Sequence, residues 1–85
     1  MDSALLEQHL RDMIVGLTGL PVDFDAHANL YLDLGVPSVQ AMSLLMAIEE
    51  YFGVSVPDEL FVDATSLETL VSMVGGLADA QQTGT

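Results

Sequence analysis

The sequence predicts an all-α fold, a small bundle of three to four helices with a long loop after the first helix. Two observations lead to this prediction. Apolar residues recur at helical spacing in separate segments, and glycine or proline closes most of these segments. The chain has 85 residues, which is enough for one domain. We expect that domain to span residues 1–80 and a flexible tail to occupy residues 81–85.

The first helix is expected over residues 3–17, with Asp2 or Ser3 as its cap. Its apolar stripe consists of Leu6, Leu10, Met13, Ile14 and Leu17. His9 and Arg11 fall outside this stripe, so both are expected to be solvated.

Residues 18–37 show no helical period, and Pro21 blocks continuation of the first helix. A loop of this length in a small domain is expected to be packed or functional. A short helical turn could form near residues 30–32. The loop's expected apolar anchors are Leu20, Val22, Phe24, Leu30, Leu32 and Leu34.

The second helix is expected over residues 38–52, with Gly53 as its stop. Its predicted core face consists of Ala41, Leu44, Leu45, Ile48 and Phe52. Val39, Met42 and Met46 lie on the adjoining flank, and no charged residue occurs between Asp33 and Glu49. The helix therefore has either two buried sides or one buried side and a contact surface; ordinary core filling is an equally good role for the methionines.

Two further helices complete the bundle. Pro57 suits the first turn of a short third helix, which is expected to carry Leu60, Phe61 and Val62 inward. The last helix is expected to start at Thr65, because Thr65 and Glu68 have the spacing of a capping box. Its apolar stripe is Leu67, Leu70, Val71 and Val74, and Gly75-Gly76 should weaken it.

The charge is strongly one-sided, with 13 acidic residues against Arg11 alone and a net charge of −12. This excludes non-specific nucleic-acid binding, which depends on Lys and Arg, and disfavours anionic membranes. It favours basic partner surfaces. The chain has no cysteine. It shows no signal peptide and no apolar run as long as a membrane span, so we expect a cytoplasmic monomer without a membrane or nucleic-acid partner.

Ser38 is the candidate functional residue. Pro37 prevents the helix from extending backwards, which puts Ser38 where an N-cap belongs. Ser38 could be only a cap, worth about 1 kcal/mol, and local sequence alone favours this because serine caps are common. Alternatively its hydroxyl could carry a phosphate diester, since a helix N-terminus tolerates an anion well.

Several stretches together resemble the acyl carrier protein family, including the related peptidyl carriers. Residues 33–39 read Asp-Leu-Gly-Val-Pro-Ser-Val, which is similar to that family's Asp-Leu-Gly-x-Asp-Ser-Leu motif. Residues 47–59 look like its Leu-Glu-Glu-x-Phe-Gly-x-x-Ile-Pro-Asp stretch, and residues 65–67 look like the start of its last helix. The likeness covers roughly residues 5–74.

The resemblance implies that Ser38 receives 4′-phosphopantetheine from a phosphopantetheinyl transferase. The chain would then be a non-catalytic carrier that holds an acyl or aminoacyl group as a thioester. It would pass this group between acyl-transferring or condensing enzymes of fatty-acid-like, polyketide or peptide biosynthesis. The expected partner-docking residues are Asp33, Leu34, Pro37, Val39, Met42, Met46, Glu49 and Glu50. An apolar slot for the acyl chain could be lined by Leu45, Leu60, Phe61 and Val62.

The chain departs from the family pattern beside the serine. Pro37 replaces an aspartate, which keeps open a second hypothesis, an unmodified carrier-like interaction module. Gln40 and Ser43 stand where many members of the family have acids, so we expect docking led by Val39, Met42 and Met46, with less salt dependence than is usual.

A third hypothesis is a small metal-binding regulator using Asp23, Asp25 and His27, although this spacing is not diagnostic and no metal site is predicted. A hydrolase is not indicated, because no nucleophile-elbow glycines surround Ser38.

Overall fold

The computed structural model describes residues 2–83 and consists, over that range, of four helices without a strand. The helices are α1 (Ser3–Thr18), α2 (Gln40–Phe52), α3 (Asp58–Asp63) and α4 (Leu67–Thr83). The predicted all-α class, the order of the helices and the long first loop are therefore confirmed.

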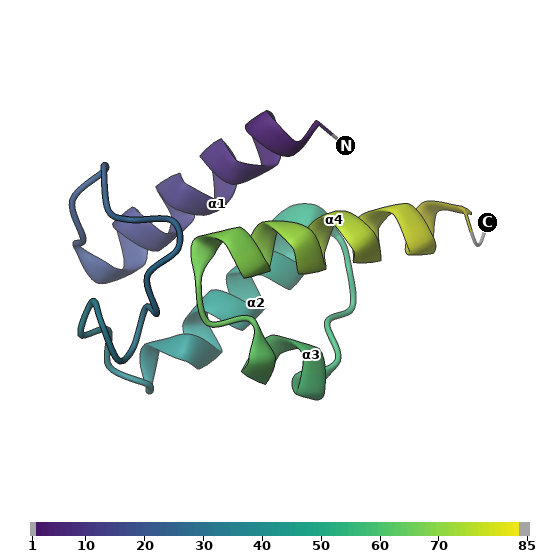
Figure 1. Cartoon of the computed structure of the whole chain (residues 1–85). Coiled ribbons are helices and arrows are strands. Elements are labelled where there is room, and N and C mark those ends of the chain that lie inside the picture. The colour runs from purple at the N-terminus through teal and green to yellow at the C-terminus, as the bar shows by residue number, and fades with distance from the viewer. Residues whose placement is uncertain (1, 84–85) are drawn as a thin grey trace.

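The long helices pack against one another, α1 on both α4 and α2, while the short α3 packs on α4 (Figure 1). The start of α1 and the end of α4 lie on the same side of the molecule, and the long loop covers the opposite end. The fully buried side chains are Leu6, Leu10, Ile14, Leu30, Ile48, Leu67, Leu70 and Val74. Each contributes roughly 1.5–3 kcal/mol by leaving water. The predicted helix faces thus meet in one core.

The long loop is held by buried apolar side chains and by backbone hydrogen bonds, and the predicted anchors Leu20 and Leu34 pack against the core while partly buried. Phe24 and Leu30 are buried, as predicted. The Leu30 amide donates to the Thr65 carbonyl at 2.8 Å, and the Glu68 amide donates to the Ala26 carbonyl at 3.0 Å. These bonds tie the loop to the start of α4.

Two of the expected loop anchors are wrong. Val22 is 69% exposed and Leu32 is 86% exposed. A hydrogen-bonded turn occupies residues 30–33, and it turns Leu32 outward while Leu30 points into the core. The spacing of apolar residues predicts burial only in regular helices and strands, so it does not show which side chains of a turn point inward.

The predicted solvation of Arg11 is also wrong. Its Nη1 donates to the carbonyl oxygens of Val22 at 2.8 Å and Phe24 at 2.7 Å. Its guanidinium carbon lies 4.4 Å from the centre of the Phe24 ring, within cation–π range. The loop folds back over α1, so a residue outside the apolar stripe of that helix still acquires partners.

His9 is exposed, as predicted, but it is not free of contacts. Its Nδ1 lies 3.1 Å from the Tyr51 hydroxyl of α2, and the two ring centres are 5.4 Å apart. This contact joins α1 to the last turn of α2.

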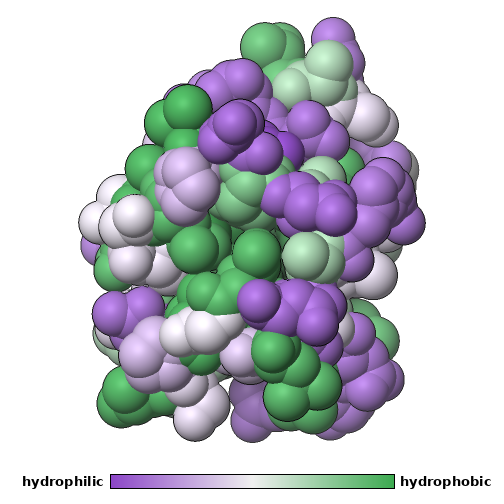
Figure 2. All heavy atoms as spheres, turned by 60° about the vertical axis from the view of Figure 1, so that its left-hand side comes forward, coloured by the Kyte–Doolittle hydropathy of each residue, from purple (hydrophilic) through white to green (hydrophobic). Residues whose placement is uncertain are grey.

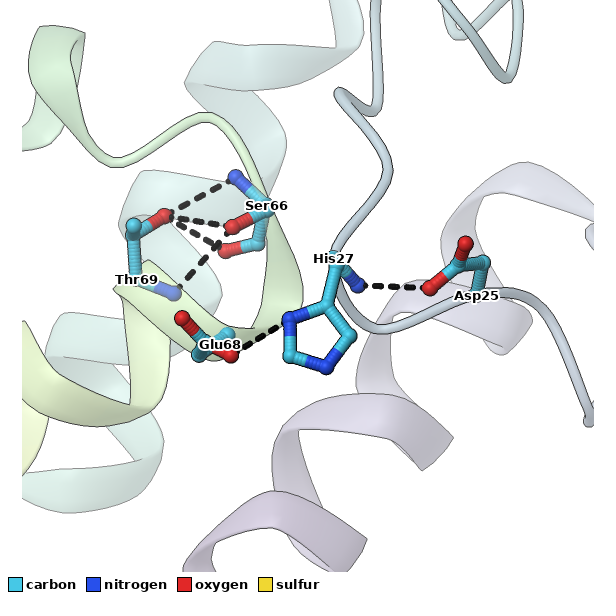
Figure 3. Close-up of polar contacts among 5 residues, drawn as sticks. All are labelled: Asp25, His27, Ser66, Glu68 and Thr69. Carbon is cyan, nitrogen blue, oxygen red and sulfur yellow. Dashed lines mark hydrogen bonds and ion pairs between the residues drawn. The ribbon is translucent and has the colours of Figure 1, made fainter.

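The predicted start of α4 is wrong by two residues. The helix begins at Leu67, and its capping pair is Ser66 and Thr69. The Thr69 amide donates to the Ser66 Oγ at 3.2 Å, and the Ser66 amide donates to the Thr69 Oγ1 at 2.9 Å (Figure 3). The bonds to the long loop hold Thr65 outside the helix, so the reciprocal capping moves one residue along the chain.

The end of α4 extends further than the sequence indicates. The helix continues through Gly75 and Gly76 to Thr83. The Gln81 side chain accepts from the Ser55 amide at 3.0 Å and donates to the Ser55 carbonyl at 2.9 Å. Residues 81–83 are therefore helical where a flexible tail was predicted, and residues 84–85 of that tail lie outside the described residues.

Candidate functional site

Ser38 lies in a turn that leads into α2. The Pro37 carbonyl accepts the Gln40 amide at 2.9 Å, and the Ser38 carbonyl accepts the Ala41 amide at 3.0 Å. Helix α2 begins at Gln40, and the residue in its N-cap position is Val39, which has helical backbone angles and makes no side-chain cap. The predicted start at Ser38, with a serine cap, is wrong, because backbone carbonyls satisfy the first amides of the helix.

The Ser38 side chain is exposed, and its hydroxyl forms no hydrogen bond with any residue in the range 2–83. This removes the simplest structural role for the serine. A hydroxyl that neither caps the helix nor bonds to the loop is available for modification.

The loop in front of Ser38 is fixed by Asn29 and Asp33. The Asn29 Oδ1 accepts the amides of Tyr31 at 2.9 Å and Leu32 at 3.0 Å. The Asp33 Oδ2 accepts the Asn29 amide at 2.9 Å, and the Asn29 carbonyl accepts the Asp33 amide at 3.0 Å. Sequence reasoning missed this role of Asp33, although Asn and Asp four residues apart in a loop are a signal for such a turn.

Gly35 completes the approach to the serine. Its φ of 74° is left-handed, a conformation that glycine adopts at little cost. The next residue, Val36, is buried and donates its amide to the Leu30 carbonyl at 2.9 Å. The Asp-Leu-Gly stretch therefore forms a closed turn that leads to Ser38.

A groove of about 290 Å³ opens beside Ser38. It is lined by Tyr31, Ser38, Ala41, Met42, Phe61, Val62 and Thr65. Two residues of the predicted acyl slot, Phe61 and Val62, line it. The other two lie elsewhere: Leu45 is buried in the core, and Leu60 lines a separate groove of about 450 Å³ between α3 and α4.

The prediction that all of Leu60, Phe61 and Val62 point inward is wrong for two of the three. Phe61 is buried, but Leu60 is 45% exposed and Val62 is 70% exposed. Three consecutive residues of a helix point in directions about 100° apart, so a six-residue helix cannot bury all of them on one side.

The flank of α2 predicted as a contact surface is exposed. Val39 is 77% exposed, and Met42 and Met46 are each 62% exposed, so these side chains do not fill the core. Figure 2 shows the side of the molecule on which the long loop lies, and apolar atoms reach the surface there between hydrophilic ones. We call Val39, Met42 and Met46 the apolar flank.

The remaining candidate docking residues differ in their surroundings. Asp33, Pro37 and Glu50 are exposed, whereas Leu34 is half-buried. Glu49 is half-buried, and its Oε2 accepts the Val56 amide at 2.9 Å. Glu49 therefore already supports the segment between α2 and α3.

The acidic loop segment is not arranged as a metal site. No cluster of three or more potential metal ligands occurs within residues 2–83. His27 pairs with Glu68 of α4, with 2.5 Å between Nδ1 and Oε2, while the Asp25 carboxylate accepts the His27 amide at 2.9 Å (Figure 3). The structure thus uses His27 to tie the loop to α4.

None of the helices described is long and apolar enough to cross a bilayer.

The site fits a covalently attached phosphopantetheine arm. Its point of attachment would be an exposed, unbonded hydroxyl, and the adjacent groove has apolar walls that suit the methyl groups and methylenes of the arm. Thr65, a residue with a polar side chain, also lines this groove, and the arm carries amides as well as apolar groups.

Comparisons with known proteins agree with this geometry. Residues 8–74 match the family described as Phosphopantetheine attachment site. The chain is 35% identical over 79 residues to an acyl carrier protein of Syntrophobacter fumaroxidans, covering 92% of this chain and 94% of the relative. It is 33% identical over 82 residues to an acyl carrier protein of Akkermansia muciniphila, covering 95% and 99%. Members of this family carry 4′-phosphopantetheine as their covalent cofactor and work with biosynthetic enzymes. The chain therefore belongs to the phosphopantetheine-binding acyl carrier protein family.

Proposed function

We propose that Ser38 carries the phosphopantetheine arm and that the protein holds an acyl or aminoacyl group on the arm's terminal thiol as a thioester. The observation that carries this proposal is the exposed Ser38 side chain, whose hydroxyl has no partner among residues 2–83 and which lines the groove. It also occupies the serine position of the family motif.

The attachment chemistry needs a free nucleophile, and Ser38 supplies it. On a transferase, the Ser38 Oγ would attack the pantetheine-bearing phosphorus of coenzyme A and lose its proton. An Oγ–P bond forms, the P–O bond between the two phosphates breaks, and adenosine bisphosphate leaves. The turn around Asn29 and Asp33 holds the backbone that leads to Ser38, which reduces the conformational entropy lost when the transferase binds.

The chain's own residues would act after loading by holding the arm and by docking. The groove beside Ser38 shelters the proximal part of the arm, with Phe61 and Val62 as its far wall. The apolar flank and the neighbouring Asp33, Leu34, Pro37, Glu49 and Glu50 form the docking surface for the transferase and for acyl-transferring or condensing enzymes. The protein contributes no catalytic group. We expect it to act as a monomer in the cytoplasm, since a net charge of −12 opposes self-association.

The test is loading in vitro. The purified protein is incubated with coenzyme A and a broad-specificity phosphopantetheinyl transferase, and its intact mass is measured. We expect a gain of one phosphopantetheine, a new thiol in a chain that has no cysteine, and neither change for Ser38→Ala. Ser43→Ala is the matched control, since Ser43 is also exposed and lies one turn into α2; it should load normally.

Pro37 supports a second candidate function, an unmodified interaction module. It is exposed beside Ser38 and offers no carboxylate to a transferase. A Pro37→Asp variant that loads readily, beside a native chain that stays unmodified both in vitro and in its own cells, would favour this candidate. Native protein isolated from its cells with the arm on Ser38 would exclude it.

A further inference from the structure

The polar side chains that line the groove beside Ser38 all end in a hydroxyl. They are those of Tyr31, Ser38 and Thr65, and the rest of the lining is apolar. Since the Ser38 hydroxyl is the proposed point of attachment, Tyr31 and Thr65 are the side chains of this groove that could donate a hydrogen bond to an attached arm.

An arm on Ser38 begins with a phosphodiester, and the chain has no free basic side chain to pair with this anion. Arg11 is the one Lys or Arg of the sequence, and its Nη1 already donates to two carbonyl oxygens of the long loop. Both histidines also have partners of their own. The phosphodiester would therefore depend on neutral hydrogen-bond donors.

The backbone at the start of α2 offers few such donors. The amides of Gln40 and Ala41 already donate to nearby carbonyl oxygens, and Pro37 has no N–H. The amides of Ser38 and Val39 form no hydrogen bond within residues 2–83, but the phosphodiester oxygens have more lone pairs than two amides can satisfy. A side-chain hydroxyl is the donor that could complete this set.

Tyr31 carries a hydroxyl of this kind on a fixed backbone. Its amide donates to the Asn29 Oδ1 at 2.9 Å, and the amide of the preceding Leu30 donates to the Thr65 carbonyl at 2.8 Å. The Tyr31 side chain is half-buried, and its hydroxyl forms no hydrogen bond with any residue in the range 2–83. Burial raises the pKa of the Tyr31 phenol, so the group stays neutral and keeps its proton to donate.

We propose that the Tyr31 hydroxyl donates a hydrogen bond to the phosphodiester that joins the arm to Ser38, and so directs the arm along the groove. A phenol is more acidic than the aliphatic hydroxyl of Thr65, which makes it the stronger donor to an anion. A hydrogen bond to a charged acceptor is also stronger than one between neutral groups. Tyr31 is thus a positioning residue for the arm, and the inference rests on the proposed attachment at Ser38.

The first experiment observes the phosphorus atom itself. The native chain, Tyr31→Phe and Tyr51→Phe are loaded with coenzyme A and a transferase, intact mass establishes loading, and phosphorus NMR spectra are recorded. The phosphodiester signal should shift for Tyr31→Phe. It should keep its native position for Tyr51→Phe, the matched control, because Tyr51 is the only other tyrosine and does not line the groove. A signal that moves for Thr65→Val and not for Tyr31→Phe would overturn the choice of Tyr31.

The second experiment leaves Tyr31 unchanged. Tyr51→Phe makes Tyr31 the sole phenol of the chain, so ultraviolet absorbance follows the titration of Tyr31 alone. Loading should raise the pKa of Tyr31 further, since an anion beside the phenol disfavours the phenolate. Circular dichroism establishes that the chain stays folded over the titration. An equal pKa before and after loading would contradict the contact.

Thermal unfolding gives a third readout. Tyr31→Phe should lower the unfolding midpoint by about 4–8 °C more in the loaded protein than in the unloaded protein, because the hydrogen bond exists only after loading. Loaded protein in which the phosphorus signal and the unfolding midpoint do not respond to Tyr31→Phe would overturn the role of Tyr31 and leave the attachment intact. Absence of a mass gain would overturn the attachment, and the role of Tyr31 with it.

Discussion

At the scale of single residues, Arg11 and Gly35 support the fold in two different ways, the first through partners that lie far away in the sequence and the second through its own backbone angle. Arg11 has no role that its own helix reveals, yet it bonds to two loop carbonyls. Gly35 belongs to a recognisable motif, and its backbone angle gives the physical reason for the glycine.

Gly35→Ala should destabilise the protein. No atom lies within 4 Å of the added Cβ, so the cost comes from the φ of 74° and should be about 1–2 kcal/mol. Urea unfolding measures it. Gly16→Ala is the control, because Gly16 lies in α1 with equally open space and should instead stabilise by about 0.5–1 kcal/mol. If both substitutions changed the free energy of unfolding in the same direction, the left-handed conformation assigned to Gly35 would be contradicted.

Arg11→Met should also destabilise, because methionine keeps much of the apolar stem and loses both hydrogen bonds. We expect about 1–2 kcal/mol, the range for bonds to a charged donor reduced for partial exposure. Chemical unfolding again provides the measurement. Gln8→Met on the same helix should change stability by less than about 0.5 kcal/mol. If Arg11→Met lowered the stability no more than Gln8→Met does, the loop would not depend on the guanidinium.

At the scale of helices, the start of α4 depends on tertiary contacts. The capping pair is Ser66 and Thr69 in place of the predicted Thr65 and Glu68, and the loop bonds to the Thr65 carbonyl and the Glu68 amide hold Thr65 outside the helix. The same holds for α2, where backbone carbonyls close the first turn and leave Ser38 unused.

Ser66→Ala should cost about 1 kcal/mol, because the Thr69 amide loses its acceptor. Thr65→Ala should cost less than half as much, since the Thr65 side chain forms no cap. Thermal and urea unfolding of the two variants would distinguish the observed cap from the one expected from sequence. A larger loss for Thr65→Ala would favour the latter.

The apolar flank of α2 predicts how partners bind. Met46→Ala should weaken binding to the transferase by about 5-fold or more, as for a contact residue at an interface. Ser43→Ala, another exposed change in the same helix, should have little effect. Binding of the native chain should vary only weakly with ionic strength, because the first turns of α2 carry no charge. A steep salt dependence would show that the acidic residues elsewhere lead the contact.

At the scale of the whole molecule, the high net negative charge opposes the compact folded state. A net charge of −12 on 85 residues makes the folded state repel itself. Added sodium chloride, from about 0.01 M to about 0.5 M, should therefore raise the unfolding midpoint by several degrees through screening. A midpoint that is flat or falls with salt would mean that attractive interactions outweigh the repulsion between the acidic residues.

Much of the architecture could be predicted from the sequence because helical periodicity reports local burial. The buried Leu10, Ile14, Ile48 and Leu70 all lie on predicted faces. The predictions that were wrong concern residues whose surroundings depend on where the long loop folds. Arg11 and the exposed Leu32 could not be placed without knowing that the loop crosses α1 and turns around Asn29.

The key residue of the candidate site could be predicted from the sequence, but the geometry of the site could not. The motif pointed to Ser38, but the groove beside it is formed by segments that meet only in the folded chain.

The positions of the first and last helix have a practical consequence. The start of α1 and the end of α4 lie on one side of the molecule, and α2 starts at the other (Figure 1). Fusing this carrier to an enzyme, or immobilising it on a sensor surface, through either end would leave the Ser38 side facing away from the attachment. Tethered forms should therefore load and dock like the untethered chain.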